Sequence, residues 1–186
     1  MSKIAVIYWS GTGNTAAMAA ILGKGIQDGG ATAKVVSVED IKADDLKDYP
    51  VFALGCPSMG NETLEETYME DFVTEVESFA SGKKIGLFGS YGWGDGEWMR
   101  NWVARMEEAG AQVYGGEDAI CMNEPDSEAE EKLEALGKEA VLHGEMCLGE
   151  GSGAVALFPF LDMGTAVYQS MSTFDDIHVE QYEELV

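Results

Sequence analysis

The chain has 186 residues, 46% of them hydrophobic, so it is long enough for one domain with a substantial core and too apolar to be disordered throughout. Its 34 acidic residues outnumber 11 Lys and Arg, and the formal net charge is −23. This charge argues against nucleic acid and anionic membranes as partners and favours basic protein surfaces; the alternative is that the acidity only keeps the protein soluble.

Apolar runs and cysteines exclude two further classes. The longest apolar run, 154–161, is far too short to span a bilayer. No signal peptide is expected, because strand and turn residues follow Met1 to Ile4 directly. Three widely spaced cysteines argue against a disulfide framework, which predicts a reducing, cytoplasmic location. His143 and His178 lie too far apart for a local metal motif, so no metal is predicted.

Strand-like and helix-like segments alternate over residues 3–141. Helix start signals at Pro125 and Asp126 precede the last of these segments. The alternation predicts a five-stranded parallel sheet with helices on both faces, joined by right-handed crossovers. The expected strands are 3–9, 32–38, 51–56, 85–90 and 112–121, the last interrupted at Gly115–Gly116, and the expected helices are 14–27, 68–79, 97–109 and 128–141.

Three loops rich in glycine and polar residues follow the first, third and fourth strands. They read SGTGNT (10–15), PSMGNE (57–62) and YGWGDGE (91–97). Ligands of such sheets bind beyond the carboxyl ends of the strands, so these loops are expected to meet at one site.

The first loop, 10–15, has the composition of a phosphate site without a cation. No Lys or Arg occurs at positions 4–23. Backbone amides, the positive helix end and the hydroxyls of Ser10, Thr12 and Thr15 can hold a phosphate together. The loop lacks the Lys of a nucleoside-triphosphatase loop and does not fit the dinucleotide fingerprint. The alternative is an ordinary strand-to-helix turn.

Four motifs together resemble one family. WSGTGNT, LGCPSMGNE, LFGSYGWGDGEWM and MNEPD occur in the order found in short-chain flavodoxins of anaerobic bacteria. The resemblance covers 3–141 and implies an α/β flavodoxin-like fold: a doubly wound parallel sheet in the order 2-1-3-4-5. It also implies non-covalent FMN and a role as a low-potential one-electron carrier rather than an enzyme, with transient redox-enzyme partners.

The resemblance also implies how FMN is held. The first loop would bind the 5′-phosphate as a dianion, and Trp93 and Met59 would cover opposite faces of the ring. The alternative is that Trp93 anchors its loop and Met59 packs in the core. The implied cofactor-binding residues are Ser10, Gly11, Thr12, Gly13, Asn14, Thr15, Pro57, Ser58, Met59, Gly60, Asn61, Glu62, Gly89, Ser90, Tyr91, Gly92, Trp93, Gly94 and Asn123.

By the same resemblance, residues 59–62 tune the redox chemistry. The peptide at Gly60 would flip on one-electron reduction, so that its carbonyl accepts a hydrogen bond from flavin N5–H in the neutral semiquinone. Asn61 is expected to tolerate a left-handed turn, although family members commonly carry Asp or Ser there. Glu62 would bind flavin N3; the alternative is a solvated carboxylate at a helix start. Carboxylates and low dielectric disfavour the anionic hydroquinone, which lowers the second potential.

Weaker assignments concern the remaining polar and aromatic residues. Ser90 and Asn123 would contact the phosphate side or the ribityl chain, and the backbone of Gly89 and Trp93 would face the pyrimidine edge of the ring. Trp98 and Trp102, four residues apart on one helix, are predicted to be packing residues.

Two other functions remain open. An NAD(P)H-dependent FMN or quinone reductase of the same fold needs an open ring face, which Trp93 and Met59 would block. A signalling receiver needs an acidic cluster after the first strand, where Ser10 and Thr12 stand instead.

Residues 142–186 form a second predicted segment without a counterpart in short-chain flavodoxins. The segment carries eight acidic residues and no Lys or Arg. It begins as a flexible link and continues into the apolar stretch 154–171, which must dock in water. Packing on the first domain, 1–141, is the first expectation; self-association or binding to a redox partner are the alternatives.

Overall fold

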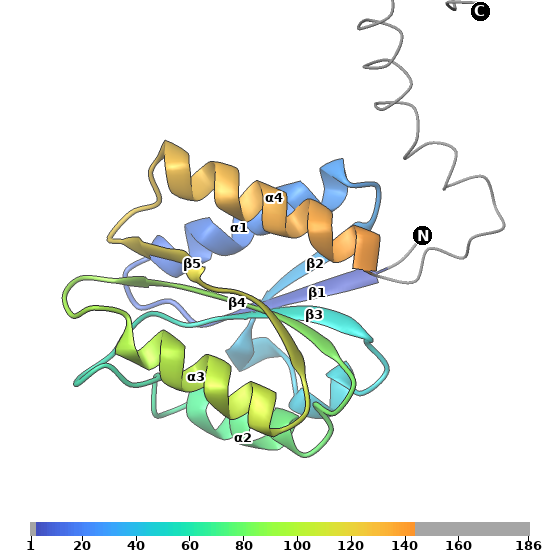
Figure 1. Cartoon of the computed structure of the whole chain (residues 1–186), viewed down its shortest axis with the longest axis horizontal. Coiled ribbons are helices and arrows are strands. Elements are labelled where there is room, and N and C mark those ends of the chain that lie inside the picture. Colours follow the sequence, from blue (N-terminus) through green and yellow to red (C-terminus); the bar gives the residue numbers. More distant parts are fainter. Residues whose placement is uncertain (1–2, 144–186) are drawn as a thin grey trace, which may run out of the picture. The chain divides into compact units, whose positions relative to one another are not determined.

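A parallel five-stranded sheet forms the centre of the fold in the computed structural model, which describes residues 3–143 (Figure 1). The strand order is β2-β1-β3-β4-β5, and all four pairings are parallel. The predicted doubly wound sheet and its order are therefore confirmed. The strands are β1 (Lys3–Tyr8), β2 (Thr32–Ser37), β3 (Val51–Gly55), β4 (Lys84–Tyr91) and β5 (Gln112–Met122).

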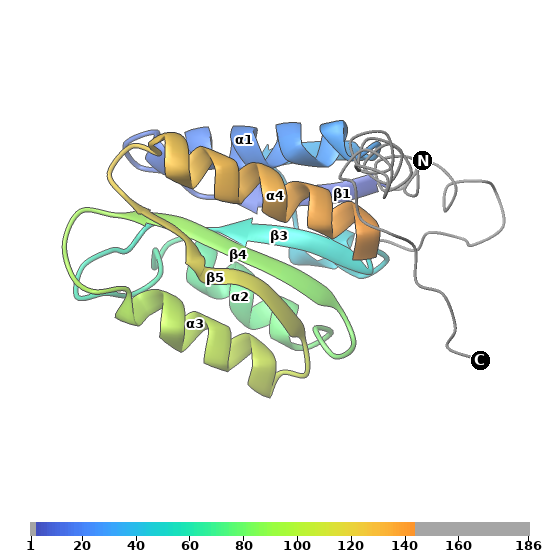
Figure 2. The ribbon, with the colours of Figure 1, turned by 45° about the horizontal axis from the view of Figure 1, so that its top comes forward.

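Four helices cover the two faces of this sheet. Helices α1 and α4 lie side by side on one face, and α2 and α3 cover the other (Figures 1 and 2). The helix α4 continues to His143, beyond the predicted end at Val141. The bounds are α1 (Asn14–Asp28), α2 (Met69–Glu77), α3 (Glu97–Glu108) and α4 (Ser127–His143).

Two short 3₁₀ helices between β2 and β3 were not predicted from the sequence. They are η1 (Val38–Asp40) and η2 (Ala43–Leu46). Each spans a single turn, too short for a helical repeat of apolar residues to emerge. The last strand is not interrupted, because β5 is continuous from Gln112 to Met122. The predicted break is instead a register shift in its pairing with β4, where Leu87 lies opposite Gly115 and Gly89 opposite Ile120.

The core has one cluster on each face of the sheet. Strand β3 is buried at every residue, which explains its unbroken apolar run. Trp98 and Trp102 are 2% and 1% exposed, so the prediction that they are packing residues is confirmed. The Trp98 indole donates a hydrogen bond to the Cys56 carbonyl at 3.3 Å. The predicted extension, 142–186, lies almost entirely outside the described residues, which end at His143.

Candidate functional site

The three predicted loops lie together at one end of the sheet, on the left of Figure 1. Backbone hydrogen bonds join their bases: Trp9 N donates to Gly55 O at 3.0 Å, and Ser58 N donates to Ser90 O at 2.9 Å. Asn123 also belongs to this end, because its amide donates to Tyr91 O at 2.8 Å. The carboxyl ends of the strands thus position the predicted residues as the parallel topology requires.

The loop after β1 presents an open helix end. Gly13 adopts φ 99°, a left-handed conformation that favours glycine, and its amide donates to Ser10 Oγ at 3.0 Å. No side chain caps α1, and its first turn contains no carboxylate. Free amides and the positive end of the helix dipole therefore point out of the loop, an arrangement suited to an anion.

A buried hydroxyl pair fixes this loop to the sheet. Thr15 Oγ1 lies 3.0 Å from Ser90 Oγ, and the two residues are 1% and 4% exposed. Thr15 thus joins the first turn of α1 to the end of β4, whereas Thr12 is exposed. Among the predicted hydroxyls, Thr15 and Ser90 form the support of the loop.

Residues 59–63 form a tight turn. Met59 and Thr63 exchange two backbone hydrogen bonds of 2.9 Å across it. Gly60 has φ 47° and Glu62 has φ 54°, so the left-handed residues flank Asn61. Asn61 itself does not adopt a positive φ, so this turn does not use the tolerance expected of it.

The Glu62 carboxylate connects this turn to the next loop. Its Oε1 accepts hydrogen bonds from Gly96 N at 3.0 Å and Glu97 N at 2.9 Å, at the start of α3. A carboxylate here satisfies free amides and complements the helix dipole. The carboxyl carbon would lie 2.5 Å from a Cβ at residue 94, so Gly94 permits the contact. Both bonds use Oε1, which leaves Oε2 at the site without a hydrogen-bond partner among residues 3–143.

Trp93 lies on the surface of the loop between β4 and α3. It is 59% exposed, so core packing does not explain an aromatic residue at this position. Arg100 braces the loop by binding Asp95 Oδ1 at 2.7 Å and the Asp95 carbonyl at 2.9 Å, and it also binds Glu117 at 2.9 Å. The hydrogen bonds to Glu117 and Asp95 raise the pKa of Arg100.

Two supporting residues were missed by sequence reasoning. The Trp9 ring packs on the first loop, 3.0 Å from where a Cβ on Gly11 would lie. Glu65 is 6% exposed, and its carboxylate accepts the amides of Thr67, Tyr68 and Met69 at 2.8–3.1 Å. A Glu shortly before an apolar helical repeat was the signal for this capping role.

Burial and hydrogen bonding oppose each other at Glu65. Burial would raise the pKa of this carboxyl, but the amides of Tyr68, Met69 and Thr67 outweigh it and hold the pKa below the ordinary value. The carboxylate is therefore charged at neutral pH and fixes the start of α2.

The remaining predicted residues described here shape the loops or lie at their bases. Gly89 lies inside β4, and a Cβ there would come 2.1 Å from the Cys56 carbonyl, so this glycine permits the close approach of β3 and β4. Asn123 is exposed and adopts φ 63°. Pro57, Ser58 and Met59 are half-buried at the base of their loop.

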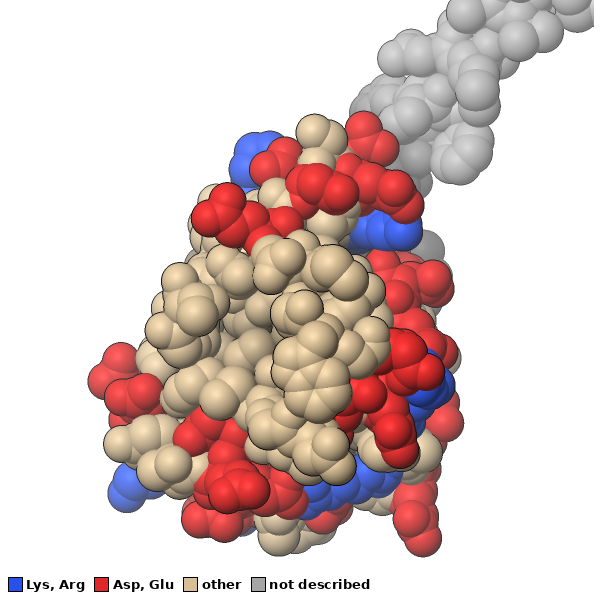
Figure 3. All heavy atoms as spheres, turned by 90° about the vertical axis from the view of Figure 1, so that its left-hand side faces the viewer, with Lys and Arg blue, Asp and Glu red and all other residues tan. Residues whose placement is uncertain are grey.

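The surface at this end has a distinct charge pattern. Figure 3 shows an uncharged centre framed by Asp and Glu, with few Lys and Arg. Such a pattern combines an apolar contact area with an acidic rim, which suits an apolar ligand or a partner with a basic rim.

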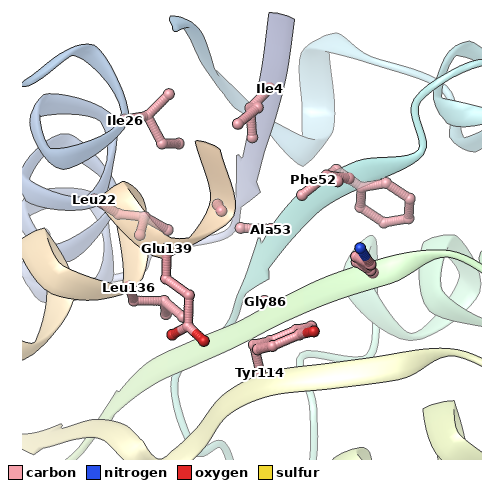
Figure 4. Close-up of a pocket in the computed structure, with 12 residues that line it drawn as sticks. Ile4, Leu22, Ile26, Phe52, Ala53, Gly86, Tyr114, Leu136 and Glu139 are labelled. Carbon is pink, nitrogen blue, oxygen red and sulfur yellow. The ribbon is translucent and has the colours of Figure 1, made fainter. Parts of the chain in front are cut away.

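A small apolar cavity lies at the opposite end of the sheet. Strand residues near the starts of β1, β3 and β4 line it together with α1 and α4, and the Glu139 carboxylate and the Tyr114 ring lie beside it (Figure 4). Its volume of about 20 Å³ has room for a water molecule but not for a tricyclic ring. The cavity is therefore not the predicted site.

Comparison with known proteins decides the family. The flavodoxin family model matches residues 6–155. The flavodoxin of Clostridium beijerinckii is 46% identical over 134 residues, which are 72% of this chain and 96% of that protein. This chain belongs to the flavodoxin family. The solution structure of two-electron reduced Megasphaera elsdenii flavodoxin matches with a TM-score of 0.66 and 41% identity, over 74% of this chain and 99% of that one.

A second similarity is of another kind. The nicotinate-nucleotide–dimethylbenzimidazole phosphoribosyltransferase of Acetivibrio thermocellus is 46% identical over 54 residues, which are 29% of this chain but only 15% of that enzyme.

Flavodoxins are electron-transfer proteins that bind FMN. This flavodoxin has features that fit that cofactor: an open helix end for a phosphate at α1, and the exposed Trp93 ring at the same end of the sheet. Bound FMN supplies the redox chemistry. Within residues 3–143, no helix is long and apolar enough to cross a membrane.

Proposed function

We propose that this flavodoxin is a low-potential one-electron carrier and catalyses no reaction of its own. Its bound FMN would alternate between the neutral semiquinone and the hydroquinone. The observation that carries the proposal is the uncapped start of α1, which offers amides and hydroxyls to a dianion at the same end of the sheet as the exposed Trp93 ring. An anion held by neutral donors leaves the acidic field of the protein intact, and that field disfavours a further negative charge.

The chain's own residues would divide the binding work. The amides at the start of α1, with Ser10 and Thr12, would hold the phosphate. Trp93 and Met59 would cover the two faces of the ring and exclude water. Glu62 Oε2, free of the bonds that Oε1 makes, would accept the hydrogen of ring N3.

Gly60 is the proposed hinge of the redox response. The paired hydrogen bonds of Met59 and Thr63 hold both ends of the turn, while Gly60, at φ 47°, has no side chain to resist peptide rotation. Gly60→Ala should lower the yield of the blue half-reduced form, measured in visible spectra during dithionite titration. Gly82→Ala is the control, because Gly82 has φ 77° in open space away from the three loops. An unchanged blue yield in Gly60→Ala would contradict the hinge.

The alternative is an NAD(P)H-dependent FMN or quinone reductase. The arrangement of Trp93 and Met59 in adjacent loops argues against it, because bound nicotinamide needs an open ring face. Steady-state turnover of NADH with a quinone separates the two functions. A carrier should give almost none, and sustained turnover would support the reductase.

Charge supports a proposal about partners. With a net charge of −23, the chain should bind redox enzymes transiently through basic docking surfaces and should not bind nucleic acid or membranes. A cytoplasmic location fits such partners and stays a prediction.

We further propose a two-part organisation, 1–141 and 142–186. The flavodoxin relative matches 134 residues and the phosphoribosyltransferase 54, slightly more together than the 186 residues of the chain, and we infer that the second similarity falls mainly on the extension. A piece covering 15% of an enzyme does not carry its activity, so a packing role for 154–171 is the better proposal.

Truncation tests this role. If 154–171 mediates self-association, light scattering should report a larger mass for the full chain than for a chain ending at Glu145, at equal concentration. If it packs within the monomer, the mass stays monomeric and truncation lowers the melting temperature. No change in mass or melting temperature would contradict a packing role.

A further inference from the structure

An open groove separates the 3₁₀ segment 38–44 from the start of α2. Its volume is about 520 Å³. Val38 and Phe72, which are 4% and 6% exposed, form an apolar floor together with the half-buried Ile41. Tyr68 stands at the edge and is 45% exposed, one of the few large hydrophobic side chains on the surface of residues 3–143. The apolar surface that the groove offers to a ligand therefore comes mainly from Tyr68 and Ile41.

The rim of the groove is acidic. It carries Glu39, Asp44, Asp71 and Glu75 against a single cation, Lys42. Asp44 pairs with Lys47, but the described part of the chain provides no ion pair for the other three carboxylates. Their field is thus largely uncompensated.

Another face of α2, which carries Glu70 and Glu77, differs. There Arg105 binds Glu70 at 2.7 Å and also binds Glu77. Asp71 and Glu75, one turn apart, are the exposed carboxylates that α2 directs to the groove. Internal ion pairing therefore does not account for the acidic residues on this side.

The groove is connected to the flavin loops. The Glu65 carboxylate holds the amides of Thr67 and Tyr68 at 2.9 and 2.8 Å, so the wall of the groove is fixed to the segment that follows the turn 59–63.

We propose that this groove is a docking site for a cationic segment of a partner protein that carries one large apolar side chain. The apolar side chain packs on Tyr68 and Ile41, and lysines or arginines on either side face the four rim carboxylates. An apolar centre with a charged rim is the usual anatomy of a transient interface. The identity of the partner as a redox enzyme rests on the proposed electron-carrier function, but binding to the groove does not require it.

The test uses the full-length, FMN-loaded protein labelled with ¹⁵N. The probe is a short synthetic lysine-rich peptide containing one phenylalanine, and the control peptide has serine in its place. Amide shifts should move at Ile41, Tyr68 and Asp71 and stay fixed at Gly116, which lies in a second open groove between α3 and β5. The serine peptide should bind about tenfold more weakly.

Matched charge reversals locate the site. Asp71→Lys with Glu75→Lys should raise the peptide Kd about tenfold or more, whereas Glu107→Lys with Asp118→Lys, in the second groove, should raise it less than about twofold. Both pairs change the net charge equally. Equal weakening by both pairs, or equal binding of the two peptides, would overturn the proposal, because either result means diffuse attraction to an acidic protein.

Two controls keep the outcome interpretable. Dispersed amide spectra of each variant verify the fold. Dithionite titration of the Asp71→Lys, Glu75→Lys protein should still pass through the blue intermediate, since neither residue belongs to the flavin loops. A protein that binds the peptide as predicted but lacks a blue intermediate would refute the electron-carrier proposal and leave the docking site standing.

Discussion

The phosphate loop and the ring-side loops of this flavodoxin are built differently. The loop at 10–15 rests on a buried hydroxyl pair, Thr15 with Ser90, and on an internal bond from Gly13 N to Ser10 Oγ. The turn at 59–63 is exposed at its tip, has left-handed residues on both sides of Asn61, and is joined to the Trp93 loop by the Glu62 carboxylate.

The difference matches what each region must do. A phosphate keeps its charge in every redox state of FMN, so a rigid, preorganised loop serves it best. The ring changes its protons and charge, so the groups around it must adjust, and glycine with positive φ permits this at low cost. Substitution of Thr15 should therefore lower the free energy of unfolding most, whereas substitution of Gly60 should mainly hinder rotation of its peptide.

Breaking the buried pair should have the largest effect. Thr15→Val keeps the shape but leaves the Ser90 hydroxyl buried without its partner, which should cost about 1–3 kcal/mol of unfolding free energy and weaken FMN binding. Urea unfolding of the apoprotein and fluorescence titration with FMN measure the two effects. Thr12→Val, at an exposed position, should weaken FMN binding without loss of stability. Equal stability loss in both variants would contradict the contrast.

Removing the link between the ring-side loops should have a smaller effect. Glu62→Ala leaves Gly96 N and Glu97 N without an acceptor and should cost about 1–2 kcal/mol in urea unfolding. Glu62→Gln retains an oxygen acceptor and should cost about half as much. Glu66→Ala removes an exposed carboxylate nearby and is the charge control. A loss in Glu66→Ala as large as in Glu62→Ala would mean that net charge, not the link, is responsible.

The Glu65 carboxylate, which follows the ring-side turn, should make the free energy of unfolding depend on pH. Its folded pKa lies below the ordinary value of 4.5, so its contribution to stability is present above that pH and lost as the pH falls through the folded pKa. Between neutral pH and pH values below 4.5, unfolding free energy should therefore fall less steeply in Glu65→Gln than in the parent. Parallel pH curves for the two proteins would show that the three amide bonds do not perturb this carboxyl.

The sequence predicted the sheet, its order and the meeting of three loops, because apolar periodicity and strand–helix alternation are local signals with a fixed topological consequence. It did not predict the support of those loops. The Thr15–Ser90 pair joins residues far apart in sequence, and the bond from Glu62 to the start of α3 depends on how two loops meet. Likewise, residue preference did not reveal that Glu62 is left-handed, next to the Met59–Thr63 bridge.

Stepwise reduction tests the central claim most directly. The purified protein, loaded with FMN, is titrated with dithionite under anaerobic conditions while visible spectra are recorded. The account predicts a yellow protein that passes through a blue intermediate in high yield before it bleaches. Direct conversion from yellow to the bleached form, without the blue species, would contradict one-electron transfer.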